Sequence, residues 1–375
     1  MIFNKNIFDH KNNYTIGVEE EYMICEPFSG NLVNKADEIL NYANSKLKKR
    51  LSYELICSEI ESNTSICFNS IEAIEEIAYL RSKLKEIGNK LDFRIGISGT
   101  HPTAKPMNQK FVNTDGYNWV ANQLNYYAKN NITFALHVHI AVPNPELSIR
   151  AVNGLRRWIP PLLALSTNSP FFNGMQTGMR SSRTFQFGSF PRTNIPEKFD
   201  SYDHFLSIVN SFLNTKTIEK PRQIWWKIRP HLDYGTIEFR MIDVQRSLKK
   251  THMFIALFQA LTHQTIEDSL NDNLNENLSL ELLNDGLWKA SRFNFNALLT
   301  DCSDNEELKM KSFINKMMNY CKESLAYFNN QHIIDDVNHI LINGTECDEQ
   351  IEIFKNNDMN TLKKFLMNNV TYEYK

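Results

Sequence analysis

The sequence predicts an α+β fold in which a sheet with one polar face is backed by helices. Two observations support this class. Short runs of alternating apolar and polar residues, typical of strands, alternate with helical stretches in the first two-thirds of the chain, and the pattern is helical from about residue 250 onward. No linker separates these parts. We therefore expect a single domain over residues 1–375, with residues 250–375 as a mainly helical layer on the same core.

The first strand is expected within residues 15–24, TIGVEEEYMI, where three glutamates stand among apolar residues. Residues two apart on a strand point to the same side of the sheet. Glu19 and Glu21 therefore share one face, whereas Glu20 belongs to the opposite face and must sit among apolar neighbours or near an edge. Because buried carboxylates need a partner or a metal ion, this strand predicts a positive group nearby.

Three further stretches repeat this design, each with an apolar side and a polar side. Their polar sides carry Glu59 and Glu61 (residues 57–66), His137 and His139 (residues 133–142), and Glu238 and Arg240 (residues 236–243). A solvated sheet face would explain such residues without function, but solvated faces usually carry lysine, threonine, serine and mixed charges. If the four strands are neighbours, their carboxylates converge, repel one another and require a cation.

The donor types indicate which cation this would be. Glutamate oxygens with one or two imidazoles favour Mg²⁺, with Mn²⁺ as the alternative. Zinc sites use more histidine or cysteine, and the nearest zinc-like feature is the His137-x-His139 pair, without an HExxH helix. Metal-assisted hydrolysis at a zinc or manganese site is therefore the weaker interpretation.

Apolar residues at helical spacing predict the helices that back the sheet. The expected ranges are 70–90, 146–159, 251–270, 279–299, 305–328 and 346–368. Asn69 and Glu72 form a capping box for the first helix, and Pro160-Pro161 must kink or end the second. Residues 28–34 and 100–120 are expected to be loops.

Composition excludes several classes of function. The formal net charge of −2 gives no general attraction to nucleic acid or to anionic membranes. The longest apolar run, at residues 159–165, is too short to span a bilayer, and residues 1–13 do not resemble a signal peptide. Six cysteines without CxxC spacing are typical of a reduced protein, so we expect a cytoplasmic location.

Residues 166–192 contain no acidic residue and carry Arg180, Arg183 and Arg192 with three glycines. Glycine lets backbone amides approach a ligand, and arginine matches phosphate or carboxylate. The segment predicts a mobile loop that closes on an anion, although a basic surface loop would show the same composition. No Walker A or GxGxxG motif is present.

A second candidate for anion binding lies in residues 223–233, QIWWKIRPHLD. On a strand, Trp225, Lys227, Arg229 and His231 share a face. Arg229 could hold a substrate carboxylate or simply pair with an acidic neighbour. Arg229 and Trp225 are therefore the candidate substrate-binding residues.

Seven short motifs occur in a fixed order over about residues 15–300. They are GVEEEY (17–22), EIESNT (59–64), SGTHP (98–102), HVHI (137–140), LLALSTNSPFFNG (162–174), WWKIRP (225–230) and TIEFRMID (236–243). This ordered set resembles the type 2 glutamate–cysteine ligase family, the bacterial carboxylate–amine ligases. The last 75 residues carry no motif of this kind.

The resemblance implies a fold like the catalytic fold of glutamine synthetase. That fold is a curved antiparallel sheet, backed by helices, with the active site on its concave face. The polar sheet face follows from the residues themselves, whereas the curvature and the strand order follow from the resemblance alone. The resemblance also suggests a homodimer.

The resemblance further implies roles for individual residues. Glu19, Glu21, Glu61, His137 and Glu238 would bind Mg²⁺ ions, His139 would reach the nucleotide phosphates, and Arg240, with Arg180 or Arg183, would face the transferred phosphoryl group. The implied reaction uses ATP to join glutamate to cysteine through an acyl phosphate, without a cysteine nucleophile.

Other functions remain open at this stage. The same ligase chemistry with a different amine acceptor is one, and a metal- or nucleotide-binding protein without turnover is another. Two departures from the family pattern bear on this. Phe172 stands where tryptophan is common, and Lys227 stands where an acidic residue is common, which puts the amine substrate in doubt more than the chemistry.

Overall fold

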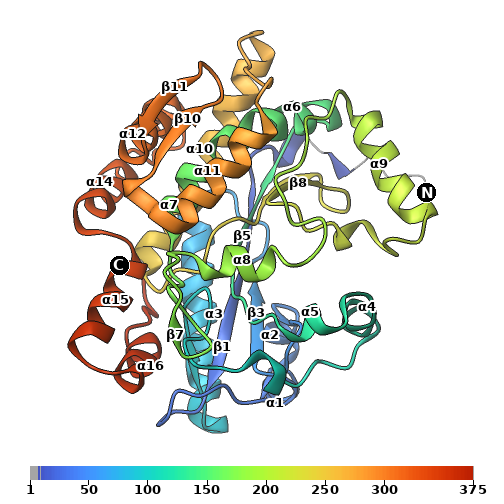
Figure 1. Ribbon diagram of the computed structural model, residues 1–375. Coiled ribbons are helices and arrows are strands. Elements are labelled where there is room, and N and C mark those ends of the chain that lie inside the picture. Colours follow the sequence, from blue (N-terminus) through green and yellow to red (C-terminus); the bar gives the residue numbers. More distant parts are fainter. Residues whose placement is uncertain (1–6, 9, 375) are drawn as a thin grey trace.

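The computed structural model describes residues 7–8 and 10–374, and a seven-stranded antiparallel sheet forms its centre (Figure 1). The strands, in spatial order, are β2 (Leu51–Tyr53), β3 (Glu59–Asn63), β1 (Ile16–Cys25), β5 (Leu136–Ala141), β9 (Thr236–Phe239) and β8 (Ile228–His231), and β4 (Arg94–Gly96) also pairs with β1. All four predicted polar-faced strands are present, and they are neighbours in the order β3, β1, β5, β9. The predicted α+β class is confirmed.

One face of this sheet is apolar and is covered by three helices. Helix α3 (Ser70–Leu91) packs on β1, β3 and β4; α10 (Leu248–Leu270) packs on β5 and beside α3; and α6 (Pro145–Leu155) packs on β8 and β9. Strand residues on this face are fully buried, among them Val18, Val138 and Ile237. Burying each such side chain contributes about 1.5–3 kcal/mol to the stability of the fold. This burial determines which face of the sheet packs on the helices and leaves the other face available for polar groups.

Two of the predicted helices in the first half show clear end signals. Helix α3 begins after Asn69, whose side chain accepts a hydrogen bond from the Glu72 backbone amide at 2.9 Å, as the capping prediction required. Helix α6 ends at Leu155, and Pro160 and Pro161 stand at the start of α7 (Ile159–Ser166). The prolines therefore begin a new helix, where their missing amide protons cost nothing.

The helical prediction is partly wrong in the last third of the chain. Residues 305–328 were expected to form one helix, but β10 (Leu298–Asp301) and β11 (Glu306–Lys309) form a hairpin, followed by α12 (Met310–Tyr320) and α13 (Lys322–Tyr327). The expected helix over 346–368 is two helices, α15 (Glu346–Asn356) and α16 (Met359–Asn368). Helix α14 (Ile333–Asn343) was not predicted, whereas α11 (Leu280–Phe293) was. Figure 1 shows these C-terminal helices gathered along one side of the molecule.

Further helices are α1 (Ala36–Tyr42), α2 (Ser45–Lys48), α4 (Asp115–Leu124), α5 (Tyr126–Lys129) and α9 (Tyr202–Asn214), of which α9 is the longest, and several 3₁₀ turns lie between them. Because α4 begins within residues 100–120, that segment is only partly the loop expected from the sequence. Among the described residues, no helix has both the length and the apolar character that a bilayer crossing requires. Residues 1–6 and 9, part of the segment in which we find no signal peptide, lie outside the described residues.

A buried carboxylate ties the C-terminal hairpin to the body of the fold and gives a testable pH dependence. Asp301 accepts hydrogen bonds from Arg157 Nε and Nη2 at 2.9 and 2.5 Å, and its Oδ2 lies 2.8 Å from Lys316 Nζ. Burial alone would raise the pKa of Asp301, but the bonds from Arg157 and Lys316 lower it to about 2. An unfolded aspartate titrates at about pH 4, so this stabilisation is complete well above that pH and is lost as the pH falls through about 2.

We therefore expect the unfolding free energy of the wild type to fall more steeply between pH 4 and pH 2 than that of the Asp301→Asn variant. Urea unfolding at several pH values measures both slopes. Equal slopes for the two proteins would show that this carboxylate does not carry the effect.

Candidate active site

The polar face of the sheet brings acidic and imidazole side chains into direct cross-strand register. Three pairs carry these groups: Glu21 with Glu61, Glu19 with His137, and His139 with Glu238. Directly opposed residues on antiparallel strands have Cβ atoms about 4.5–5.5 Å apart. Neighbouring pairs on this face can therefore share one ligand.

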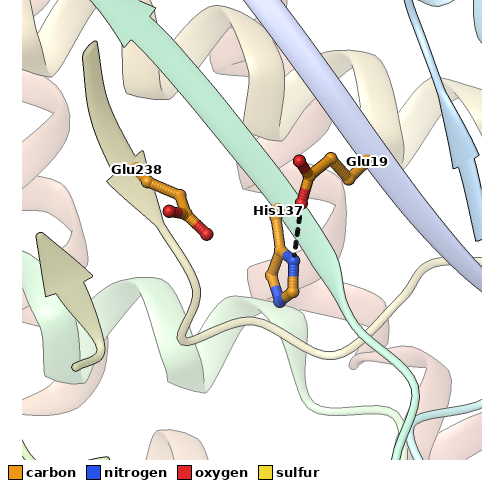
Figure 2. Close-up of side chains that lie close together, drawn as sticks. All are labelled: Glu19, His137 and Glu238. Atoms are coloured by element: carbon orange, nitrogen blue, oxygen red, sulfur yellow. Dashed lines mark hydrogen bonds and ion pairs between the residues drawn. The ribbon is translucent and has the colours of Figure 1, made fainter. Parts of the chain in front are cut away.

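Five side chains form two overlapping clusters on this face. The first cluster is Glu19, His137 and Glu238, and the second is Glu21, Glu61 and His137; in each, one ligand atom from every residue lies within 4.8 Å of the others. Figure 2 shows the members of the first cluster reaching toward one another from three adjacent strands. The structure thus brings together all five residues that the sequence analysis named as metal ligands.

The two histidines fit a role in binding a cation. His137 Nδ1 lies 3.2 Å from Glu19 Oε2, and His139 Nε2 lies 3.4 Å from Glu19 Oε1. The Nε2 atom of His137 is buried without a hydrogen-bond partner, which is unusual for a buried polar atom. With four carboxylates and one imidazole, the donor set of the two clusters suits Mg²⁺ or Mn²⁺ better than zinc.

Burial, followed by repulsion from neighbouring carboxylates, disfavours the charged form of Glu61 in the second cluster. Burial, together with the charges of Glu19, Glu54 and Glu21, raises the pKa of Glu61 well above its usual range. Burial and neighbouring carboxylates likewise raise the pKa values of Glu59 and Glu54. A cation placed among these groups would let them ionise together, because an opposite charge favours the charged form.

Glu238 is in the opposite electrostatic situation. Burial alone would raise its pKa, but Arg229 and Arg240 outweigh burial and hold the pKa of Glu238 well below its usual range. Glu238 accepts a hydrogen bond from Arg229 Nε at 2.6 Å and another from Arg240. Of the two roles left open for Arg229, the structure shows pairing with an acidic neighbour; its role in substrate binding stays a prediction.

The remaining predicted residues divide into those near the clusters and those outside them. Arg183, on α8 (Ser182–Phe187), is buried, and its guanidinium donates to the backbone carbonyls of Arg240 and Met241 at 3.1 and 3.4 Å. Its charge interacts with Glu21, so Arg183 belongs to the polar face. Arg180 does not join it, because its guanidinium pairs with Asp348 of α15.

Trp225 also lies apart from the two clusters. The centroid of its ring lies 5.9 Å from that of the Phe190 ring, and the Arg192 guanidinium lies over the Trp225 ring. Trp225 precedes β8 and does not lie on it. The prediction that Trp225 and Arg229 share a face of one strand is therefore wrong. The role of Trp225 in substrate binding stays a prediction.

The segment 166–192 is anchored more firmly than a mobile loop. Asp243 accepts hydrogen bonds from the Asn168 amide at 2.9 Å and from the hydroxyls of Ser169 and Ser181 at 2.7 and 2.9 Å. Between these anchors lies a hairpin of β6 (Phe171–Phe172) and β7 (Met175–Gln176). Exposure is confined mainly to residues 173–178 and 185–191. These hydrogen bonds hold Arg183 in place, whereas the sequence predicted that segment 166–192 would be mobile.

Two acidic residues close to the polar face were not predicted from the sequence. Glu54 lies in the turn between β2 and β3, where no periodicity indicates its direction, yet its charge interacts with Glu21 and Glu61. Asp243 follows the last polar-faced strand and was read only as part of it. In the structure, Asp243 packs against the SGTHP motif: a Cβ atom on Gly99 would lie 2.6 Å from the Asp243 carboxyl carbon, so the position requires glycine.

Solved structures with the same fold are known. The chain matches a glutamate–cysteine ligase from Francisella tularensis in complex with AMP with a TM-score of 0.76 and 13% identity, covering 96% of this chain and 88% of that one. It matches a bifunctional glutathione synthetase from Pasteurella multocida with a TM-score of 0.72 and 12% identity, covering 98% of this chain and 53% of that one. At such identities, the likeness establishes the fold alone.

Sequence relatives extend over nearly the whole chain. A Solibacter usitatus protein named "Putative glutamate--cysteine ligase 2" is 31% identical over 360 residues, covering 96% of this chain and 94% of its own. A Chloroflexus aurantiacus protein of the same name is 31% identical over 367 residues, covering 98% and 94%. The model of glutamate–cysteine ligase family 2 matches residues 15–362. The chain therefore belongs to glutamate–cysteine ligase family 2, a family of ATP-dependent ligases.

Proposed function

We propose that this protein uses ATP to join the γ-carboxyl group of glutamate to an amine, with cysteine as the first candidate acceptor. The observation that carries this proposal is the pair of overlapping carboxylate–imidazole clusters on one sheet face. Membership in glutamate–cysteine ligase family 2 supports the choice of glutamate and cysteine. A structural role for these groups is disfavoured, because so many buried like charges would destabilise the fold unless a ligand offset them.

The proposed chemistry has two steps. An oxygen of the glutamate γ-carboxylate attacks the γ-phosphorus of ATP, ADP leaves, and an acyl phosphate forms. The amine nitrogen then attacks the acyl carbon, the carbon–oxygen bond to phosphate breaks, and a proton leaves the nitrogen as the amide forms. Catalysis of phosphoryl transfer depends mainly on positioning and charge neutralisation.

The residues of the polar face have distinct roles in this scheme. Glu19, Glu21, Glu61, His137 and Glu238 would hold Mg²⁺, which when bound neutralises phosphate oxygens. His139, beside Glu19 and Glu238, faces the nucleotide phosphates. Arg240 and Arg183 stabilise the negative charge of the transferred group, and Arg229 fixes the Glu238 carboxylate. The anchored segment 166–192 keeps water from the acyl phosphate.

We also propose that the chain works as one catalytic domain in the cytoplasm. The buried apolar core runs continuously from β1 to α16, which supports a single unit. All six cysteines are free thiols, which is typical of a reducing compartment. The homodimer suggested by the resemblance stays a prediction.

A product-mass assay tests the proposed function. The protein is incubated with ATP, Mg²⁺, glutamate and a pool of amino acids, and the products are identified by mass. We expect ADP and phosphate only when glutamate and an amine are both present, together with a γ-glutamyl amide. ATP hydrolysis that does not depend on glutamate, or hydrolysis of a substrate without ATP, would contradict the proposal.

Replacing one carboxylate of the second cluster with an amide distinguishes its effect on the stability of the metal-free protein from its role in binding Mg²⁺. In the absence of divalent cations, Glu61→Gln should raise the thermal midpoint, because a neutral amide replaces a buried carboxyl group that burial and the neighbouring glutamates make costly to ionise. It should also remove most of the increase in midpoint that Mg²⁺ produces in the wild type. The matched control, Glu352→Gln, changes an exposed glutamate of α15 and should leave both values unchanged. A full Mg²⁺ response in the Glu61 variant would argue against this site.

A further inference from the structure

Lys227 lies on the polar face of the sheet, directly opposite Arg240. The pairing of β8 with β9 sets Arg229 opposite Glu238, and the next pair on the same face in this register is Lys227 with Arg240. The Arg240 backbone amide donates to the Lys227 carbonyl at 2.9 Å, so the register continues just past the ends of both strands. Side chains of directly opposed residues are close neighbours, which places the Lys227 side chain beside that of Arg240.

Arg183, on α8, joins these two cations. Its guanidinium donates to the Arg240 backbone carbonyl at 3.1 Å. Its guanidinium carbon also lies 5.8 Å from the centroid of the Phe187 ring, and the Lys227 ammonium lies 5.4 Å from the same centroid. Lys227, Arg183 and Arg240 therefore form one cationic cluster at the end of the polar face.

The cationic cluster carries more positive charge than its surroundings balance. Among the residues that the structure describes, Arg240 pairs with the Glu238 carboxylate, whereas Lys227 and Arg183 form no ion pair. Each of the three side chains has a buried nitrogen without a hydrogen-bond partner: Arg183 Nε, Lys227 Nζ and Arg240 Nε. Lys227 is only 3% exposed, so water does not reach its ammonium group freely.

Burial makes this excess charge costly. Burial, with the charges of Arg183 and Arg240, lowers the pKa of Lys227 to about 7, and the acidic group that opposes this effect is Asp243. The Asp243 oxygens already accept hydrogen bonds from the segment 166–192. An unpartnered ammonium in a buried site is unfavourable, and so are like charges that face each other across two strands. An anion bound at the cationic cluster would offset both effects.

The anion that fits this cluster best is the phosphoryl group during its transfer. A carboxylate brings one negative charge, whereas the transferred phosphoryl group spreads its charge over three equatorial oxygens. In the proposed function, Arg240 and Arg183 already stabilise this group. Lys227 lies opposite one of these arginines and shares an aromatic ring with the other, so its ammonium is placed to face the same ligand.

We propose that Lys227 is a third cationic catalytic residue, which donates a hydrogen bond to the phosphoryl group as it passes from ATP to the carboxylate. The inference rests on the proposed function and adds a residue to its first step. In that step the bond from phosphorus to the bridging oxygen of ADP breaks, with its electron pair staying on ADP, and a carboxylate oxygen forms the new bond to phosphorus. Lys227 keeps its protons throughout, so it stabilises charge without transferring a proton.

A minimal amine distinguishes a role in phosphoryl transfer from a role in binding the acceptor. Hydroxylamine reacts with acyl phosphates and carries no carboxylate. Kinetics are measured with hydroxylamine and with cysteine, in the wild type and in Lys227→Met, which keeps the side-chain length and removes an unpaired buried charge and should therefore fold. We expect kcat to fall by about a hundred-fold or more with both amines. A normal kcat, or a loss confined to cysteine, would overturn the proposal.

The conservative variant Lys227→Arg gives a readout that a purely structural role would not move. In the wild type the ammonium loses its charge as the pH rises through about 7, so kcat/KM for ATP should fall above that pH. Arginine stays charged, so Lys227→Arg should recover part of the activity and lack this fall. The groups that face Lys227, which are Arg183, Arg240 and Asp243, are unchanged in the variant. A fall that persists in Lys227→Arg would belong to another group and would contradict the proposal.

A binding measurement separates this inference from the proposed function. Aluminium fluoride, added with ADP, Mg²⁺ and glutamate, imitates the transferred phosphoryl group and requires no turnover. We expect the wild type to bind it at least about ten-fold more tightly than Lys227→Met does, whereas both bind ADP alone equally and Lys129→Met, at an exposed lysine of α5, behaves like the wild type. If this difference is seen but no amide forms from any amine, the role of Lys227 stands and the ligase function fails. If amide forms and both proteins bind aluminium fluoride equally, the role of Lys227 is wrong.

Discussion

Replacing His137 with asparagine is expected to lower ligase turnover by about a thousand-fold, the effect of losing a metal ion that contributes several kcal/mol to the transition state. His137 is the only residue shared by the two clusters among the residues that the structure describes. Its Nδ1 faces Glu19 at 3.2 Å, and its Nε2 faces Glu21 at 3.9 Å. One substitution therefore removes a ligand from both clusters at once, and steady-state kinetics at saturating ATP and glutamate measures the loss.

Two comparisons make this result specific. His139→Asn should act mainly on ATP, by raising its KM, because His139 lies at the side of the first cluster assigned to the phosphates. His339→Asn, at an exposed histidine of α14, should retain wild-type activity. Near-normal turnover in a folded His137→Asn protein would show that the clusters do not hold a catalytic ion.

Replacing Arg81 with methionine is expected to destabilise the protein by about 3–5 kcal/mol, the range for removing one partner of a buried ion pair. Arg81 on α3 is fully buried, and its Nε and Nη2 donate to the two oxygens of Glu20 at 2.9 and 2.5 Å. It also donates to the backbone carbonyls of Arg246 and Gln245 at 2.6 and 2.7 Å. The variant removes the charged partner of the buried Glu20 carboxylate, which keeps, among the described residues, only hydroxyl donors from Tyr22 and Thr251, and it removes the Arg81 donor from the Gln245 carbonyl.

Denaturant unfolding measures this effect and distinguishes its cause. Arg50→Met removes the partly exposed ion pair of Arg50 with Glu76 and should cost less than about 1 kcal/mol. The double variant Arg81→Met with Glu20→Met should be more stable than Arg81→Met alone, because it removes the stranded carboxylate. A double variant less stable than Arg81→Met would contradict this explanation.

The TIGVEEEYMI strand shows how much of the fold the sequence contains. Alternation correctly placed Glu19 and Glu21 on the polar face and Glu20 on the apolar face. It could not name Arg81 as the partner of Glu20, because the two residues are 61 positions apart and meet only when α3 packs on β1. The β10–β11 hairpin was missed for a related reason: each strand has only four residues, β11 is mostly exposed, and one of the two buried positions of β10 is the charged Asp301, so no apolar alternation marks the hairpin.

The candidate site was predictable where strand geometry defines it. All five residues of the two clusters lie on β-strands, so alternation fixed their direction and the register joined them. Glu54, in a turn, and Asp243, beyond the end of β9, have no periodicity to place them. The pairing of Arg180 with Asp348 depends on how α15 packs, which the sequence does not indicate.

The central claim, that this polar face activates a carboxylate by phosphorylation, has one direct test. Glutamate labelled with ¹⁸O in its γ-carboxyl group is supplied with ATP, Mg²⁺ and the amine found in the product-mass assay, and the released phosphate is analysed by mass. Since the acyl oxygen that attacks phosphorus stays with it when the amine displaces phosphate, the account predicts one ¹⁸O atom in each phosphate formed. Amide formation with unlabelled phosphate would contradict it.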